Sequence, residues 1–334
     1  MPNNEDFVRQ ADPFRHELLA HCYRMLGSVH DAEDLVQETF LRAWRAYDRF
    51  DDRRASLRTW LYRIATNACL TALEGKSRRP LPAGLADPSS EATPLEERPE
   101  IPWLQPIPDR LLDAEPADPA TIVASRASVR LAFIAALQHL PPRQRAVLLL
   151  RDVLSWRAAE VAELLGISTA AVNSALQRAR AHLSAAAPEQ DKLAEPARAD
   201  DRNLLNRYVT AFQTADLAAL MRLLHEDAVT EMPPYQTWFR GHDVHRQFFD
   251  LVLVRRGPGA WVMDVVGANR QLAVAAYVRR DDGLHHAHSV QVITTRDERV
   301  DHIVAFQGAK VFEMFDLPPI RPAAPMLAST AEPG

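Results

Sequence analysis

The chain has 334 residues, of which 47% are hydrophobic and 25% are charged, and it carries a formal net charge of −5. This length indicates two or three domains, and the composition is typical of a folded globular protein. No stretch approaches the roughly 18 uncharged apolar residues of a membrane span, and the N-terminus has no apolar signal-peptide core. We therefore expect a cytoplasmic protein without membrane insertion.

Charge is distributed unevenly along the chain. Basic residues outnumber acidic ones ten to four over residues 42–79 and eight to three over 126–183, whereas 80–125 holds nine acidic residues and two arginines. Two basic blocks around an acidic one suggest a polyanionic partner contacted at two places. Solvated helix faces explain the same charges equally well. The two cysteines, Cys22 and Cys69, lack metal-ligand spacing and are expected in apolar cores.

Helical periodicity dominates residues 13–79. Apolar spacing predicts a helix from Phe14 that ends at Gly27. Ser28 and Ser56 stand at N-cap positions of the next two helices, and acidic residues crowd the first turn after Ser28. The apolar stripe of the second helix is expected to point inward: Leu35, Val36, Phe40, Ala43, Trp44 and Tyr47.

Residues 80–119 contain ten prolines and almost no helical periodicity, which predicts an extended linker. Four apolar residues in this polar run suggest that part of it docks: Ile101, Trp103, Leu104 and Ile107. Helical periodicity resumes near Thr121.

Residues 143–183 carry the most specific pattern in the chain. A helix, a tight turn at Gly166 and a further helix capped by Ser168 form a helix-turn-helix arrangement. A plain three-helix core explains the apolar positions equally well. It does not explain why the last helix shows Arg178 and Arg180 and contains no acidic residue.

A second polar linker, 187–201, precedes a change of pattern. Two helices, over about 202–215 and 217–225, are followed by alternating strand-like runs, one of them WVMDVVGANRQ, with a helix near 242–253 between them. This order predicts a small α+β domain in which helices cover one face of a curved antiparallel sheet. The tail after Leu317 is rich in Pro and Ala and is expected to be disordered.

Two of these blocks resemble a known family. Residues 31–70, DAEDLVQETF to NACL, resemble region 2 of the sigma-70 family, and residues 140–183, LPPRQRAVLLL to ARAHL, resemble region 4. No long region 3 separates them, as in the extracytoplasmic-function (ECF) group of bacterial sigma factors. Residues 203–316 are similar to the SnoaL-like domain that follows region 4 in some ECF subgroups.

The resemblance implies a multidomain fold of two all-α domains, a region 2 bundle and a region 4 helix-turn-helix, followed by an α+β SnoaL-like cone. The expected division is region 2 over 8–79, an acidic linker over 80–120, region 4 over 121–186, a linker over 187–201, the SnoaL-like domain over 202–317 and a disordered tail over 318–334.

The resemblance also implies roles for the helices. Region 2 would bind the β′ coiled coil of core RNA polymerase through Asp34, Leu35, Gln37 and Glu38, and region 4 would bind the β flap. Region 2 would hold the melted −10 promoter element, which needs cations for single-stranded backbone, through Arg49, Arg53, Arg54, Arg58, Arg63 and Asn67. Trp60 is expected in the core rather than as a stacking platform.

Region 4 would read the −35 element in the major groove, where amides suit adenine edges and arginines grip phosphates. The residues so assigned are Thr169, Ala170, Asn173, Ser174, Gln177, Arg178 and Arg180. Residues 171–175 read AVNSA where many ECF relatives have TVKSR. Two positive charges are therefore missing, and weaker isolated −35 binding is expected.

SnoaL-like domains form a cone with an apolar pocket, and this fold does not by itself imply catalysis. The segment MPPYQTWFRG is expected to fold over the mouth of the cone, so a ligand pocket would include Tyr235, Trp238, Phe239 and His288. Acid–base candidates facing the pocket would be Asp227, Glu231, Tyr235, His288 and Asp301. His286 and His288 are expected on one strand face, where a third metal ligand is lacking.

We interpret the chain as an ECF sigma factor, not an enzyme, that directs promoter-specific transcription initiation and is regulated in cis by its SnoaL-like domain. One alternative is a SnoaL-like enzyme of the cyclase or isomerase type with a DNA-binding appendage. Another is a one-component helix-turn-helix regulator, which would need no region 2. No cofactor is expected. A small-molecule ligand and a separate anti-sigma factor stay open as further partners.

Overall fold

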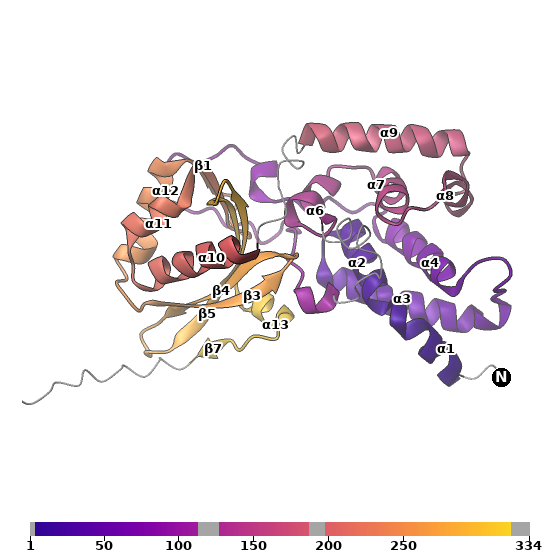
Figure 1. Ribbon diagram of the computed structural model, residues 1–334, viewed down its shortest axis with the longest axis horizontal. Helices are drawn as coiled ribbons and strands as arrows, with labels where there is room; N and C mark the ends of the chain where they lie inside the picture. The colour runs from indigo at the N-terminus through magenta and orange to yellow at the C-terminus, as the bar shows by residue number, and fades with distance from the viewer. Residues whose placement is uncertain (1–3, 113–126, 187–197, 322–334) are drawn as a thin grey trace, which may run out of the picture.

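A computed structural model describes residues 4–112, 127–186 and 198–321 (Figure 1). The helices that precede residue 187 gather in one half of the molecule, and a twisted sheet with its own helices forms the other half. This arrangement confirms the expected fold class. The predicted helical start near Thr121 and most of the predicted linker 187–201 lie outside the described residues.

The first helical group has the predicted caps. Gly27 ends its second helix with a left-handed φ of 68°, which glycine adopts at low cost. The hydroxyl of Ser28 accepts a hydrogen bond from the Asp31 amide at 3.2 Å, and Ser56 accepts one from Thr59 at 3.1 Å. The four helices are α1 (Asn4–Ala11), α2 (Arg15–Leu26), α3 (Val29–Ala46) and α4 (Leu57–Ala72).

The second helical group contains the predicted helix-turn-helix. Gly166 ends one helix with a φ of 63°, and the Ser168 hydroxyl accepts a hydrogen bond from the Ala171 amide at 3.1 Å. The helices are α6 (Leu131–Leu137), α7 (Pro142–Leu148, continued by a π-helical stretch Leu149–Val153), α8 (Ala158–Leu165) and α9 (Thr169–Ala186). Both helical groups contribute to one continuous apolar core.

Buried Arg145 joins the two helical groups. It lies on α7, and its guanidinium donates hydrogen bonds to the carbonyl of Met25, at the end of α2, and to the carbonyl of Leu140 at 3.2 Å. A cation is favoured at the C-terminal end of a helix, where carbonyls point outward without partners. Arg145 therefore closes the end of α2 from the second group.

The C-terminal half is built on one sheet. Its strands are β1 (Leu224–Glu231), β2 (Trp238–Arg240), β3 (Trp261–Ala268), β4 (Gln271–Arg279), β5 (His285–Arg296), β6 (Arg299–Gln307) and β7 (Ile320–Arg321). The order is β2-β1-β6-β5-β4-β3, with β7 beside β5, and only the β1 and β6 pair among the described strands is parallel. Its helices are α10 (Arg198–Gln213), α11 (Leu217–Leu223), α12 (His242–Phe249) and α13 (Ala309–Met314).

Both faces of this sheet are covered. Along β4, Val274 and Ala276 face the core under α10, α11 and α12, whereas Ala273 and Ala275 face the core shared with the N-terminal helices. A strand buried on both faces reads as a continuous apolar run, as LAVAAYV does. The prediction of helices on one face was therefore incomplete, because the N-terminal helices and α13 cover the other face.

The acidic linker docks along the sheet instead of remaining extended in solvent. The Ser89 amide donates to the Trp238 carbonyl at 2.8 Å, and the Arg98 amide donates to the Pro234 carbonyl at 2.9 Å. Buried Glu231 accepts a hydrogen bond from the Ala83 amide at 2.6 Å. The predicted docking of apolar linker residues is confirmed for the buried side chains of Trp103, Leu104 and Ile107.

The turn between β3 and β4 reaches into the interface of all these parts. Asn269 is fully buried, and it exchanges two hydrogen bonds with Ile107 of the linker, one at 2.9 Å from its amide and one at 3.0 Å to its Oδ1. Its Nδ2 donates to the Tyr23 hydroxyl on α2 at 2.9 Å and to the Val129 carbonyl before α6 at 2.8 Å. One side chain thus binds both helical groups and the linker.

Three expectations about local structure were wrong. Asn269 and Arg270 form a two-residue turn with φ of 54° each, where a strand-like run was expected, because Asn tolerates this conformation. Trp44, which was expected to point inward, is 47% exposed, because only its neighbour Ala43 faces the core. The helix expected over about 217–225 is present as α11, which ends at Leu223 where β1 begins. The expected disorder of the tail from 318 is wrong for residues 320–321, which form β7 and pair with β5, and residues 322–334 lie outside the described part of the chain.

Replacing Asn269 with Gly keeps the turn but removes the buried hydrogen bonds. We expect the free energy of unfolding of Asn269→Gly to fall by roughly 3 kcal/mol. The Ile107 amide and the Val129 carbonyl lose their side-chain partner, and the Tyr23 hydroxyl keeps only its bond to the Gln105 carbonyl. Asp297→Gly is the matched control, because it lies in the exposed turn between β5 and β6 with a φ of 50°. Urea unfolding of both variants checks this, and equal losses would contradict it.

Candidate functional site

The exposed side of α3 forms one continuous stripe. Asp34 and Gln37 are exposed on it, and Leu41 and Trp44, each 47% exposed, extend it by two turns. Two other residues were also expected to bind polymerase. Leu35 packs partly against the core, and Glu38 pairs with Arg42 at 2.7 Å. An exposed aromatic and a leucine beside acidic residues suit a protein surface better than phosphate.

Sequence reasoning missed Leu41 and Trp44. Trp44 was assigned to the core because it neighbours Ala43 at helical spacing. A signal was present, because Asp34, Gln37, Leu41 and Trp44 recur at intervals of three and four residues and so share a helix face.

The assigned −10 residues fall into two groups. Arg49, Arg53 and Arg54 are exposed between α3 and α4, and Asn67 is exposed on α4 itself. Arg58 and Arg63 are engaged within the protein, as the next paragraphs describe. Trp60 is partly buried and packs on Phe50 with ring centroids 5.0 Å apart, which agrees with a core position.

Arg58 belongs to the α2 and α4 interface. Its guanidinium forms a bidentate pair with Glu17, at 2.9 and 2.7 Å, and lies 4.9 Å from the Tyr62 ring centroid. These contacts stabilise the helical bundle itself.

Arg63 crosses to the helix-turn-helix. It donates to the Glu163 carboxylate on α8 at 2.7 Å, and this hydrogen bond lowers the pKa of Glu163. The Tyr62 ring also meets the Trp156 ring edge to face, with centroids 6.2 Å apart. The assigned −10 surface and the helix-turn-helix are therefore parts of one compact body.

All seven assigned −35 residues lie on the exposed side of α9, along the outer edge of the helical half (Figure 1). Arg180 forms a bidentate pair with Asp152, at 2.9 and 2.7 Å, and Arg178 donates to the Ser174 hydroxyl at 2.6 Å. The amides of Asn173 and Gln177 stay exposed with no hydrogen bond to the described residues, and they are therefore available to base edges.

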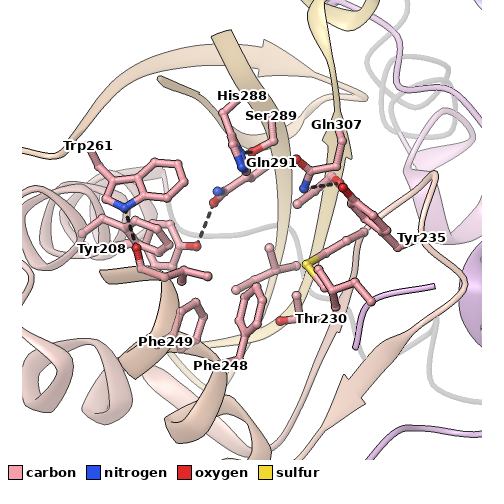
Figure 2. Close-up of a pocket in the computed structure, with 16 residues that line it drawn as sticks. Tyr208, Thr230, Tyr235, Phe248, Phe249, Trp261, His288, Ser289, Gln291 and Gln307 are labelled. Atoms are coloured by element: carbon pink, nitrogen blue, oxygen red, sulfur yellow. Dashed lines mark hydrogen bonds between the residues drawn. The ribbon is translucent and has the colours of Figure 1, made fainter. Parts of the chain in front are cut away.

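The C-terminal cone encloses a cavity of about 120 Å³ (Figure 2). The rings of Phe248 and Phe249 lie across the cavity from the polar side chains of His288, Ser289 and Gln291, and Trp261 contacts His288. None of the described residues that line it is acidic, Lys or Arg. Burial lowers the pKa of His288 to about 4, so this imidazole is neutral near pH 7.

Two of the four predicted pocket residues line the cavity, Tyr235 and His288. The other two do not. The Trp238 indole donates to the Ala86 carbonyl of the linker at 2.8 Å, and Phe239 packs against Phe248. Strand β2 pairs with β1, so its side chains leave the mouth of the cone.

The predicted acid–base carboxylates were wrong. Asp227 is exposed, and Asp301 pairs with Arg296 at 2.6 Å. Glu231 binds the linker and receives a contact from His302 at 2.8 Å, outside the cavity. None of the three lines the cavity.

His286 and His288 do not share one face of β5. A bulge shifts the register at His288, which faces the cavity, while His286 contacts Asp282 at 2.7 Å near the hairpin turn. Over residues 4–112, 127–186 and 198–321, no cluster of three His, Cys, Asp or Glu side chains is placed to hold a metal ion. In the same residues, no helix is long and apolar enough to span a membrane.

The chain matches three protein-family models, one after another along its sequence. Sigma-70 region 2 matches residues 12–79, Sigma-70 region 4 matches 130–183, and the SnoaL-like domain matches 205–313. The crystal structure of the extracytoplasmic function sigma factor SigJ of Mycobacterium tuberculosis superposes with a TM-score of 0.64 at 25% identity, covering 93% of this chain and all of that one.

Curated relatives agree with these matches. The chain is 30% identical to the ECF RNA polymerase sigma factor SigJ of Mycobacterium tuberculosis H37Rv, over 88% of this chain and 89% of SigJ. It is 51% identical to SigG of the same strain over 315 residues, which are 94% of this chain and 84% of SigG. The chain therefore belongs to the ECF RNA polymerase sigma factors and carries a SnoaL-like C-terminal domain.

Proposed function

We propose that the SnoaL-like domain regulates this sigma factor in cis by holding regions 2 and 4 in a closed form. The observation that carries the proposal is buried Asn269, which bonds to α2 of region 2, to the linker and to Val129 in the segment 121–186 that we assign to region 4. Promoter recognition requires the two regions to reach separate −10 and −35 elements. A domain bonded to both opposes that separation.

Polar contacts between regions 2 and 4 support the same closed form. Arg145 is buried, has no carboxylate partner among the described residues, and burial lowers its pKa to about 10. Separating region 4 from region 2 would leave the carbonyl of Met25 without this donor, which costs free energy unless water replaces it. Arg63, one of the residues we assign to the −10 element, is already paired with Glu163 of region 4.

The polymerase-binding face stays open in this form. We assign contact with the β′ coiled coil to the α3 stripe of Asp34, Gln37, Leu41 and Trp44, with Leu35 and Glu38 at its margin. Leu41 and Trp44 each remain 47% exposed in the closed form. Core polymerase can therefore engage region 2 first and then compete with the C-terminal domain for region 4.

We assign promoter contacts to residues that remain exposed. Arg49, Arg53, Arg54 and Asn67 would hold the −10 element, joined by Arg63 after its release from Glu163. Arg58 would contribute through the bundle rather than directly. Thr169, Ala170, Asn173, Ser174, Gln177 and Arg178 would contact the −35 element, with Arg180 released from Asp152.

Catalysis by the C-terminal domain has less support than regulation. Proton abstraction in a cone of this kind needs a base beside a polarising donor. The carboxylates considered for that role lie outside the cavity, and His288 is the one titratable imidazole among the described lining residues. We infer a regulatory rather than a catalytic domain. This regulation does not require a separate anti-sigma factor.

Removing the C-terminal domain should activate the sigma factor. We expect a chain that ends at Pro196 to support more run-off transcription per mole, with core polymerase and a cognate promoter, than the full chain. Asn269→Gly in the full chain should move activity in the same direction, with Asp297→Gly as the control. Equal activity of the two chain lengths would contradict regulation in cis.

The α3 stripe should dominate polymerase affinity. We expect the double change Leu41→Ala and Trp44→Ala to weaken binding to core polymerase at least about tenfold, since exposed aromatic anchors are common hot spots. Val265→Ala is a matched control, because Val265 is 61% exposed on the C-terminal domain. Affinity measured by fluorescence anisotropy checks this, and unchanged binding of the double variant would exclude this stripe.

A further inference from the structure

The cavity of the C-terminal cone has the chemistry of a binding site for a neutral molecule. The described wall carries no charged side chain, and the imidazole of His288, edge-on to Trp261 with ring centroids 4.8 Å apart, is uncharged near pH 7. An ionised ligand would lose its hydration there without gaining a counter-charge, which is strongly unfavourable. Neutral molecules are therefore favoured.

One side of the cavity offers hydrogen bonds that the protein does not use. The Tyr208 hydroxyl donates to Gln291 Oε1 at 2.8 Å, which orients the amide and leaves its Nε2 without a partner among the described residues (Figure 2). The same holds for Nε2 of His288, whose Nδ1 contacts Ser289. Opposite them stand the rings of Phe248 and Phe249. A flat apolar ligand with one polar end fits this arrangement.

The volume limits the ligand to about one ring. Engineered apolar cavities of about 150 Å³ bind benzene. The cavity here measures about 120 Å³ and has polar groups at one side. A single ring is the upper limit for this volume, and a short hydroxyl, carbonyl or amide substituent suits the polar side.

The lid of the cavity comes from the linker between regions 2 and 4, not from the cone. Leu95 lines the cavity and packs partly against the cone's core. Two hydrogen bonds of the next residue hold the linker beside it: the Glu96 amide donates to the Thr237 hydroxyl at 2.9 Å, and the Glu96 carbonyl accepts from the Gln236 amide at 2.7 Å. The cavity is thus completed only when the linker is docked.

We propose that this cavity binds a small neutral ring compound beneath Leu95, and that its occupancy stabilises the docked linker. This inference rests on the proposed regulation in cis for its effect on transcription, but not for binding. A ligand enclosed by Leu95 has a higher affinity for the docked form, so it shifts the equilibrium toward that form. It would therefore act as a corepressor.

The first test compares three probes of the same shape on the full chain: benzyl alcohol, benzoate and benzylamine. Ligand-observed NMR should show saturable binding of benzyl alcohol and at least about tenfold weaker binding of the two ions, by the desolvation argument above. Ala305→Leu, which fills the cavity wall, should abolish the binding. Equal binding of all three probes, or binding that survives in Ala305→Leu, would overturn the site.

Amide hydrogen exchange tests the link to the linker. With benzyl alcohol at about ten times its Kd, exchange of the Ser89, Glu96 and Arg98 amides should slow about tenfold, because undocking must expel the ligand. Leu95→Ala should lose most of this protection while the cone stays folded. Leu85→Ala is the control, since Leu85 is a linker residue that does not line the cavity. Binding without protection would overturn the proposed lid.

Run-off transcription separates this inference from the proposed function. Saturating benzyl alcohol should lower transcription by the full chain and leave the chain ending at Pro196 unchanged. If benzyl alcohol slows amide exchange in the linker but does not change transcription, the result would support the binding site and contradict regulation in cis. Equal inhibition of both chains would show an effect on polymerase instead and would contradict corepression.

Discussion

The side chain of Asn269 is the contact on which the arrangement of the domains depends. A carboxamide has both donors and an acceptor, so one residue satisfies the Ile107 amide, the Tyr23 hydroxyl and the Val129 carbonyl in a site that water does not reach. Buried polar groups are costly when unpaired, which makes this junction specific as well as stabilising. The hairpin tip fits only when region 2, the linker and region 4 are all in place.

The sheet behind this tip has two separate environments. One face packs on its own helices and encloses a neutral cavity, and the other face packs on the sigma regions. The linker contacts both, since Ile107 lies at the junction and Leu95 lies at the cavity. A change inside the cone can therefore reach regions 2 and 4 through a segment of the chain that is covalently attached to both.

Much of the fold followed from local physical rules. The N-caps at Ser28, Ser56 and Ser168 were predicted, as was the buried group around Trp103, because these depend on neighbours in sequence. Asn269 and Leu95 were not singled out, since their partners lie far along the chain and no local pattern marks them. Trp44 was misassigned because helical spacing alone does not decide which edge of an apolar stripe is covered. His288 was placed in the pocket, but its bulge at a register shift was not foreseen.

In the closed form that we propose for the free sigma factor, the Asn269 contact keeps regions 2 and 4 together. Pulsed electron paramagnetic resonance between spin labels at Arg53→Cys in region 2 and Gln177→Cys in region 4 tests it most directly, because both positions are exposed and Cys22 and Cys69 are buried. We expect one narrow distance distribution for the full chain and a broad one with a longer mean after Asn269→Gly. A broad distribution in the full chain, or an unchanged narrow one in the variant, would contradict it.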